Sequence, residues 1–136
     1  MSAVETIPAQ STIEGVWTES SGVLWYGGEH LSLREVAAAM NAVGARFVTI
    51  TAHQLSGPQA LRLEYHWDME GRLLGFAFPL EGKAMDSIFD ICEAADWIER
   101  EVHEQFAVDF IGREYEPLLL RAGNKAGIYL REEVER

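Results

Sequence analysis

The chain has 136 residues, of which 48% are apolar, so it is long enough to form one domain with its own hydrophobic core. Its 22 acidic and 11 basic residues give a net charge of −11, which would repel nucleic acid and anionic lipid headgroups. The single cysteine, Cys92, excludes an internal disulfide and leaves no thiolate set for an iron–sulfur cluster or a structural zinc. We therefore expect any redox metal to belong to another chain.

The first part of the chain shows no clear period. Residues 1–21 are rich in Ser, Thr, Glu and Ala and are predicted to form a flexible or loosely attached arm. They lack the basic segment and apolar stretch of a secretory signal, and the apolar run 73–80 is too short to span a membrane, so we expect a cytoplasmic chain. The short apolar run 23–26 suits an edge strand or a tether packed on the core.

The first clear element is a helix over residues 32–43. Ser32 and Glu35 form a capping box, and Leu31 and Val36 suit the accompanying hydrophobic staple. Apolar residues then recur at helical spacing: Leu33, Val36, Ala37, Met40 and Val43. Gly44 supplies a residue that can adopt the left-handed conformation at the C-terminal end.

From Arg46 the apolar period changes to two, which predicts three consecutive strands. The first ends at a turn over residues 56–59, and the second runs from Leu61 to Asp68 with clean alternation. Residues 69–72 suit a tight hairpin into a third strand, whose buried face is Leu74, Phe76, Phe78 and Leu80.

A pairing in which residue numbers sum to about 115 gives the first two strands a common core face. Val48, Ile50 and Ala52 then lie beside Trp67, Tyr65 and Leu63. The opposite, polar face faces water or a partner and consists of Thr49, Thr51, Arg62, Glu64 and His66. The predicted fold class is α+β: a two-layer sandwich in which an antiparallel meander of three or more strands packs on helices, with an extended C-terminal tail.

A second helix is predicted over about residues 91–107. It follows a linker over residues 81–86 and a capping signal formed by Asp90 and Glu93. Its apolar stripe is Ala94, Ala95, Ile98, Val102 and Phe106. Residues 108–120 contain Gly and Pro and are predicted to be an extended tail.

No catalytic, cofactor or metal site emerges from the residues. The four histidines lack metal-ligand spacing, no serine has a nucleophile-elbow context, and no Gly-rich loop opens a helix. Cys92 suits a small core residue better than a reactive thiolate. Trp97 does not fit a simple solvated helix face, because it lies off the apolar stripe among charged residues. A large aromatic side chain in such a position commonly anchors an interface with another protein.

The segment from Ala95 to Phe106, reading Ala-Asp-Trp-Ile-Glu-Arg-Glu-Val-His-Glu-Gln-Phe, is followed by Phe-Ile-Gly at 110–112. This ordered set resembles the signature of the 30 kDa subunit family of respiratory complex I. The resemblance covers about residues 32–121 and implies a domain over 22–121 and a C-terminal tail over 122–136.

Three positions depart from the family pattern. Ala107 stands where the family commonly has Gly, and a left-handed Ala would cost roughly 1 kcal/mol. The usual Gly-His-Pro becomes Gly-Arg-Glu at 112–114, and an Arg pair becomes Pro-Leu at 117–118. The chain also has no long C-terminal extension, which favours the short subunits of membrane-bound, energy-converting nickel–iron hydrogenases.

The resemblance implies a docking subunit of a group 4 nickel–iron hydrogenase linked to carbon monoxide or formate, with no catalytic centre of its own. It would pack against the large catalytic subunit and a neighbouring iron–sulfur subunit, without inserting into the membrane. The nickel–iron centre and iron–sulfur clusters would lie in those partners, and this chain would bind no cofactor. Its location would be cytoplasmic and peripheral to the inner membrane.

The residues expected to face the partner are Trp97, Glu99, Arg100, Glu101, Glu104, Arg113 and Arg121. Two alternatives remain: the 30 kDa subunit of complex I itself, or a free-standing scaffold or sensor with the same fold. An independent hydrolytic enzyme, using a pair such as Glu99 and His103, is the least favoured class.

Overall fold

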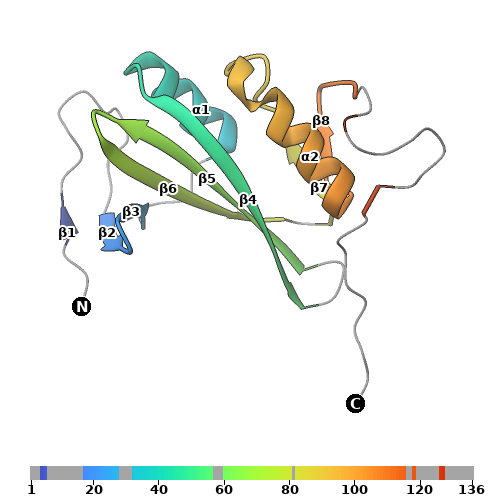
Figure 1. Cartoon of the computed structure of the whole chain (residues 1–136), viewed down its shortest axis with the longest axis horizontal. Coiled ribbons are helices and arrows are strands. Elements are labelled where there is room, and N and C mark those ends of the chain that lie inside the picture. The colour runs from blue at the N-terminus through green and yellow to red at the C-terminus, as the bar shows by residue number, and fades with distance from the viewer. Residues whose placement is uncertain are drawn as a thin grey trace.

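The computed structural model describes residues 4–5, 17–27, 32–56, 60–80, 82–115, 118 and 126–127. It has two layers: a twisted β-sheet, and two helices on one face of it (Figure 1). Helix α1 spans Leu33–Ala42 and helix α2 spans Asp96–Phe106. The predicted α+β fold class, with a sheet packed on helices, is confirmed. No helix in the described ranges is both long and apolar enough to cross a membrane.

The main sheet has six strands in the order β1-β2-β3-β6-β5-β4. The strands are β1 (Val4–Glu5), β2 (Trp17–Ser20), β3 (Val23–Tyr26), β4 (Arg46–Ser56), β5 (Ala60–Met69) and β6 (Arg72–Pro79). Neighbours are antiparallel except for β3 and β6, which are parallel. The predicted meander is therefore present as β4, β5 and β6.

The tight hairpin between β5 and β6 also forms as predicted. Glu70 and Gly71 both have positive φ angles, 51° and 85°, which is the geometry of a turn that matches strand twist. The backbone N–H of Gly71 donates to Asp68 Oδ1 at 3.1 Å, which closes the turn. The predicted turn at 56–59 falls largely outside the described residues.

The predicted register is confirmed for most of the first hairpin. Ile50 pairs with Tyr65, and Ala52 pairs with Leu63, so both pairs sum to 115. One exception is Val48, because a register shift between Phe47 and Thr49 leaves it without a partner in β5, and a second shift lies between Gln54 and Ser56. Phe47 takes its place beside Trp67 and is only 7% exposed, whereas Val48 is 38% exposed.

The N-terminal strands extend the sheet beyond the meander. Trp17 in β2 is 1% exposed and packs edge-on against Tyr26 and Phe76. The prediction of a loosely attached arm is therefore wrong for β2, because a buried indole fixes this strand to the core. The run 23–26 is not an edge strand either, since β3 lies between β2 and β6.

Helix α1 follows the sequence prediction closely. The side chain of Ser32 accepts a hydrogen bond from the backbone N–H of Glu35 at 3.1 Å, and Gly44 ends the helix with φ of 75°. Its buried face consists of Leu33, Val36, Ala37 and Met40. Leu31, the other half of the predicted staple, lies outside the described residues.

Helix α2 begins later than predicted. A short 3-10 helix, η1, spans Glu93–Ala95, and α2 starts at Asp96 without a side-chain cap. The predicted capping role of Asp90 is wrong, because its carboxylate pairs with Arg34 instead. The helix ends at Ala107, which adopts the left-handed conformation (φ 56°) despite its Cβ atom.

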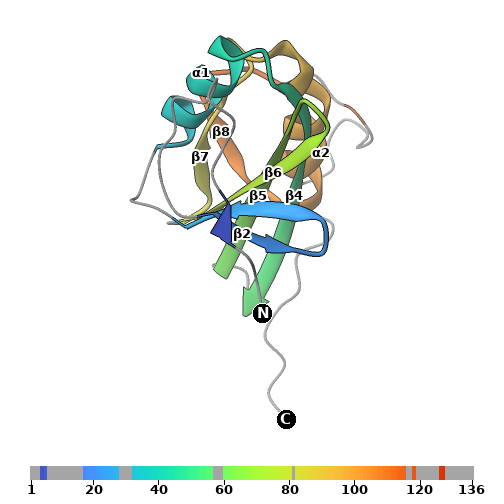
Figure 2. The ribbon, with the colours of Figure 1, turned by 90° about the vertical axis from the view of Figure 1, so that its left-hand side faces the viewer.

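A second, two-stranded sheet forms where a linker and a tail were predicted. Strands β7 (Ala84–Asp86) and β8 (Asp109–Ile111) pair in parallel. Figure 2 shows them beside α2, below the end of α1. The pairing brings the segment after α2 back to the segment before it, so residues 109–111 of the predicted extended tail are extended and also paired with β7.

Candidate interaction site

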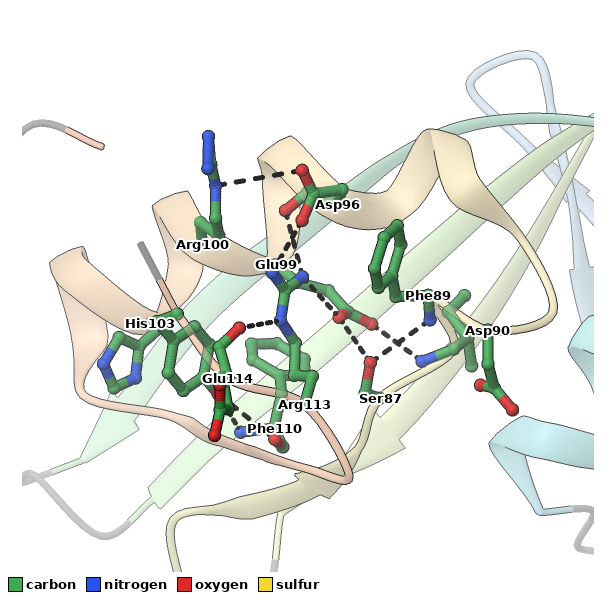
Figure 3. A network of polar contacts seen from close by, with 12 residues as sticks. Ser87, Phe89, Asp90, Asp96, Glu99, Arg100, His103, Phe110, Arg113 and Glu114 are labelled. Carbon is green, nitrogen blue, oxygen red and sulfur yellow. Dashed lines mark hydrogen bonds and ion pairs between the residues drawn. The ribbon is translucent and has the colours of Figure 1, made fainter. Parts of the chain in front are cut away.

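Three segments converge at the start of α2: the loop after β7, the first turns of α2 and the segment after β8 (Figure 3). Arg34 of α1 fixes the loop from the other side. Its guanidinium donates to both carboxylate oxygens of Asp90, at 2.9 and 2.7 Å, and to the carbonyl oxygen of Ser87 at 2.7 Å. The hydrogen bond from Arg34 holds the pKa of the Asp90 carboxyl below its usual range.

Glu99 is the buried centre of the site, with an exposed fraction of 0%. Its Oε1 atom accepts from Ser87 Oγ at 2.7 Å, and its Oε2 atom accepts from the backbone N–H of Ile88 at 2.8 Å. Burial raises the pKa of the Glu99 carboxyl, and these hydrogen bonds oppose that rise without cancelling it. Glu99 therefore ties α2 to the loop after β7.

Arg113, which follows β8, completes this polar network. Its Nη2 atom lies 2.6 Å from Asp96 Oδ1 and its Nη1 atom lies 3.3 Å from Glu99 Oε1. The guanidinium carbon also lies 5.0 Å from the ring centroid of Phe89 and 5.2 Å from that of Tyr115. With its side chain only 7% exposed, Arg113 fastens the segment after β8 to α2.

Aromatic stacking holds the same segment one turn further along α2. The rings of His103 and Tyr115 stack with centroids 3.8 Å apart. His103 Nδ1 lies 2.8 Å from the carbonyl oxygen of Val108, so Nδ1 carries the proton and donates. The Tyr115 hydroxyl accepts from the backbone N–H of Phe110, and burial raises the pKa of Tyr115 to about 12.

Glu104 makes the last attachment between α2 and the C-terminal residues. It is 5% exposed, and its Oε2 atom accepts from the backbone N–H of Leu118 at 2.7 Å. Its carbonyl oxygen accepts from the backbone N–H of Gly127, also at 2.7 Å. The carboxylate therefore bonds to this chain's own backbone.

The structure corrects three of the residues that were expected to face a partner. Glu99, Glu104 and Arg113 are buried and bonded within the chain, because the segments around β7 and β8 fold back onto α2. Glu101 is partly exposed, and its Oε1 atom accepts from Gln105 Nε2 at 3.3 Å. Arg121 lies outside the described residues.

Trp97 is the exposed residue of the site, and the mostly buried Arg100 side chain lies beside it. Trp97 is 67% exposed, as expected for a residue off the apolar stripe. The guanidinium carbon of Arg100 lies 5.4 Å from the centre of its ring. Arg100 Nε is 3.9 Å from Asp96 Oδ2, which is too long for a hydrogen bond, and the Arg100 side chain is 13% exposed.

The side chains gathered here are suited to holding segments together and to recognition. Within the described ranges, no three His, Cys, Asp or Glu side chains lie close enough to bind a metal ion. Burial raises the pKa of the Cys92 thiol, so this cysteine is not an activated nucleophile. The Glu99 carboxylate is satisfied by donors from its own chain, so it is not a free base.

Sequence reasoning missed Ser87, Phe89 and Tyr115, whose roles depend on the return of β8 to β7. One signal could have found the burial of Glu99. Ala95, Glu99 and Val102 are spaced by four and three residues, and all three are buried, so Glu99 lies within the buried stripe of α2.

The fold and the site define a class of protein: a small α+β domain whose polar network is internal and in which Trp97 is exposed beside that network. Residues 29–134 match the family model for the respiratory-chain NADH dehydrogenase 30 Kd subunit. The chain belongs to this family, whose members are subunits of multi-subunit respiratory complexes. The resemblance to this family that the sequence indicated is confirmed.

Two solved structures have a similar fold. A trypsin-resistant fragment of Nqo5 aligns over 70% of this chain and 83% of its own length, with 19% identity and a TM-score of 0.58. A chain of the membrane-bound sulfane sulfur reductase, an archaeal respiratory membrane complex, aligns over 94% of this chain and 73% of its own, with 21% identity and a TM-score of 0.62.

Proposed function

We propose that this chain is a non-catalytic docking subunit of a membrane-bound group 4 nickel–iron hydrogenase and packs against the large catalytic subunit. The exposure of Trp97 carries the proposal, since a solvent-facing indole costs hydrophobic free energy that a partner surface would recover. The helix that exposes it also contains the Trp-Ile-Glu-Arg-Glu sequence through which the chain resembles the family, and it lies within the residues that match the family model.

Family membership supports an assembly role for this chain, and the fold similarity to an archaeal respiratory membrane complex supports an assembly at a membrane. Under this proposal the chain lies on the cytoplasmic side, next to an iron–sulfur subunit. The nickel–iron centre and the clusters belong to those partners, and this chain binds no cofactor. Metal analysis of the purified chain, with less than one equivalent of nickel, iron or zinc expected, checks the last point.

The decisive experiment is purification of the tagged full chain from its native host in a mild detergent, followed by mass spectrometry of the proteins that remain bound. A nickel–iron large subunit in stoichiometric amount supports the proposal. Recovery with NADH dehydrogenase subunits alone would instead assign the chain to complex I, the second candidate, which the name of the matching family favours. A monomer without any bound respiratory subunit contradicts both.

A further inference from the structure

Arg100 has hydrogen-bonding capacity that its own chain does not use. Its Nε atom is shielded from solvent and has no hydrogen-bond partner within the described part of the chain. A buried, charged donor without an acceptor is rare in folded proteins, because its lost hydration is not replaced. The group lies beside the exposed ring of Trp97, in the region where a partner would dock.

The nearest carboxylate is occupied elsewhere. Asp96 Oδ1 accepts from Arg113 Nη2 at 2.6 Å, whereas Asp96 Oδ2 remains 3.9 Å from Arg100 Nε. Glu99 is engaged with Ser87 and Ile88 and lies within reach of Arg113. Arg113 therefore draws the local negative charge inward, and Arg100 is left as a cation with a weak internal partner.

The Arg100 guanidinium carbon lies 5.4 Å from the centre of the Trp97 ring, so the two groups are in cation–π contact. A guanidinium over an indole face loses less freedom on binding than a free Arg side chain, because its plane is already oriented. Trp and Arg are also the residue types most often found at the energetic centres of protein interfaces. Together they place an exposed indole next to a guanidinium whose Nε atom has no hydrogen-bond partner among the described residues.

We propose that Trp97 and Arg100 recognise an apolar pocket on the partner subunit whose rim carries an Asp or Glu carboxylate, which accepts hydrogen bonds from Arg100. This inference rests on the proposed docking function and specifies the chemistry of the partner. The chain's net charge of −11 disfavours a broadly acidic partner, so the contact is a local pair that sets register and specificity. Arg113 is a positioning residue, because it keeps Asp96 away from Arg100.

A zero-length crosslink tests the pair directly. The full chain with Arg100→Lys is assembled into the native complex and treated with a carbodiimide, which joins an amine to a carboxylate with loss of water. The matched control is Arg46→Lys, at a side chain that is 70% exposed and 3.4 Å from Asp68 on the sheet. Peptide mass spectrometry then locates the bonds.

We expect position 100 to crosslink to an Asp or Glu of the partner, and the control position to give only bonds within the chain. Adding Arg113→Gln should reduce the intersubunit bond several-fold and increase the bond to Asp96. Arg100→Glu should reduce recovery of the partner about tenfold or more, measured on preparations in which the isolated chain still unfolds cooperatively, because a carboxylate beside Asp96 on a side chain that is 13% exposed also lowers folding stability.

The outcomes separate the two proposals. A complex that assembles normally, but whose position 100 bonds only to Asp96 or to nothing, overturns the carboxylate pocket and leaves the docking function standing. Failure of the unmodified chain to assemble with any respiratory subunit overturns both. Equal losses of assembly for Arg100→Glu and Arg46→Glu also overturn the specific pair, since general charge would then explain the effect.

Discussion

Two sides of α2 hold charged side chains in opposite ways. On the inner side, Glu99 is fully buried and has donors from Ser87, Ile88 and Arg113. On the outer side, Arg100 stacks on an exposed indole and has a shielded Nε atom without a hydrogen-bond partner in the described residues. Charge density on a helix is therefore a poor guide to a recognition surface, because most of the charged side chains on the inner side of α2 are bonded within the chain, and we expect recognition on the outer side instead.

The largest expected effect comes from breaking the inner side. Glu99→Ala should lower the free energy of unfolding by about 3–5 kcal/mol, because it leaves Arg113 buried without one of its carboxylates and leaves two further donors without an acceptor. Urea unfolding of the purified chain measures the loss. The control, Glu101→Ala, changes a partly exposed carboxylate and should stay within about 0.5 kcal/mol. Similar losses for both variants would show that Glu99 is not the centre of the network.

A pH-dependent effect should appear when the cation of the network is removed. Arg113→Met keeps an apolar chain between Phe89 and Tyr115 but removes the charge, and should cost about 1.5–3 kcal/mol at neutral pH. The loss should shrink at about pH 4, because Glu99, whose pKa is raised in the fold by burial, then binds a proton and no longer needs the cation.

The sign of this effect follows from the direction of the pKa shift. A carboxyl with a raised folded pKa stabilises the fold most below its unfolded value of 4.5, and that contribution is lost as the pH rises through the folded pKa. Removing Arg113 raises the folded pKa of Glu99 further, since Arg113 lowers it in the intact network. A loss that is equal at both pH values in urea unfolding would contradict this account.

A smaller effect, this time a gain in the free energy of unfolding, is expected at the C-terminal end of α2. Ala107→Gly should raise the free energy of unfolding by about 1 kcal/mol, because Ala107 is held in the left-handed region at φ 56°. The mirror control is Gly44→Ala at the end of α1, where φ is 75° and an added Cβ would meet nothing within 4 Å. In thermal melts, Ala107→Gly should raise the melting temperature and Gly44→Ala should lower it. If both variants melt at a lower temperature, the packing of the Ala107 side chain outweighs its backbone strain.

The meander and α1 could be predicted from sequence because their signals are local. The spacing of Leu33, Val36 and Met40, the hairpin at 69–72 and the alternation along β5 all lie within one element or between neighbours. The register of the first hairpin followed from the same alternation. The register shifts at Val48 and between Gln54 and Ser56 escaped, since periodicity gives no sign of an inserted residue.

The site could be predicted only in part, because its contacts join distant segments. The exposure of Trp97 followed from its place off the apolar stripe, which is a local property. The partners of Glu99 and Arg113 depend on the parallel pairing of β7 with β8, two short strands whose sequences carry no clear period. The burial of Trp17 likewise depends on strand β3, which pairs with a strand about 50 residues later in the chain.

The smallest effect on folding should come from the outer side. Trp97→Ala removes a side chain that is 67% exposed and whose ring contact is with Arg100, so the free energy of unfolding of the isolated chain should change by no more than about 0.5 kcal/mol. Assembly should respond quite differently, because an indole buried on docking typically contributes about 2 kcal/mol or more at an interface. Urea unfolding of the isolated chain and quantitative recovery of the tagged complex give the two numbers. If Trp97→Ala lowers the free energy of unfolding by as much as it weakens assembly, Trp97 stabilises the fold of its own chain. The distinction between the two sides of α2 then fails.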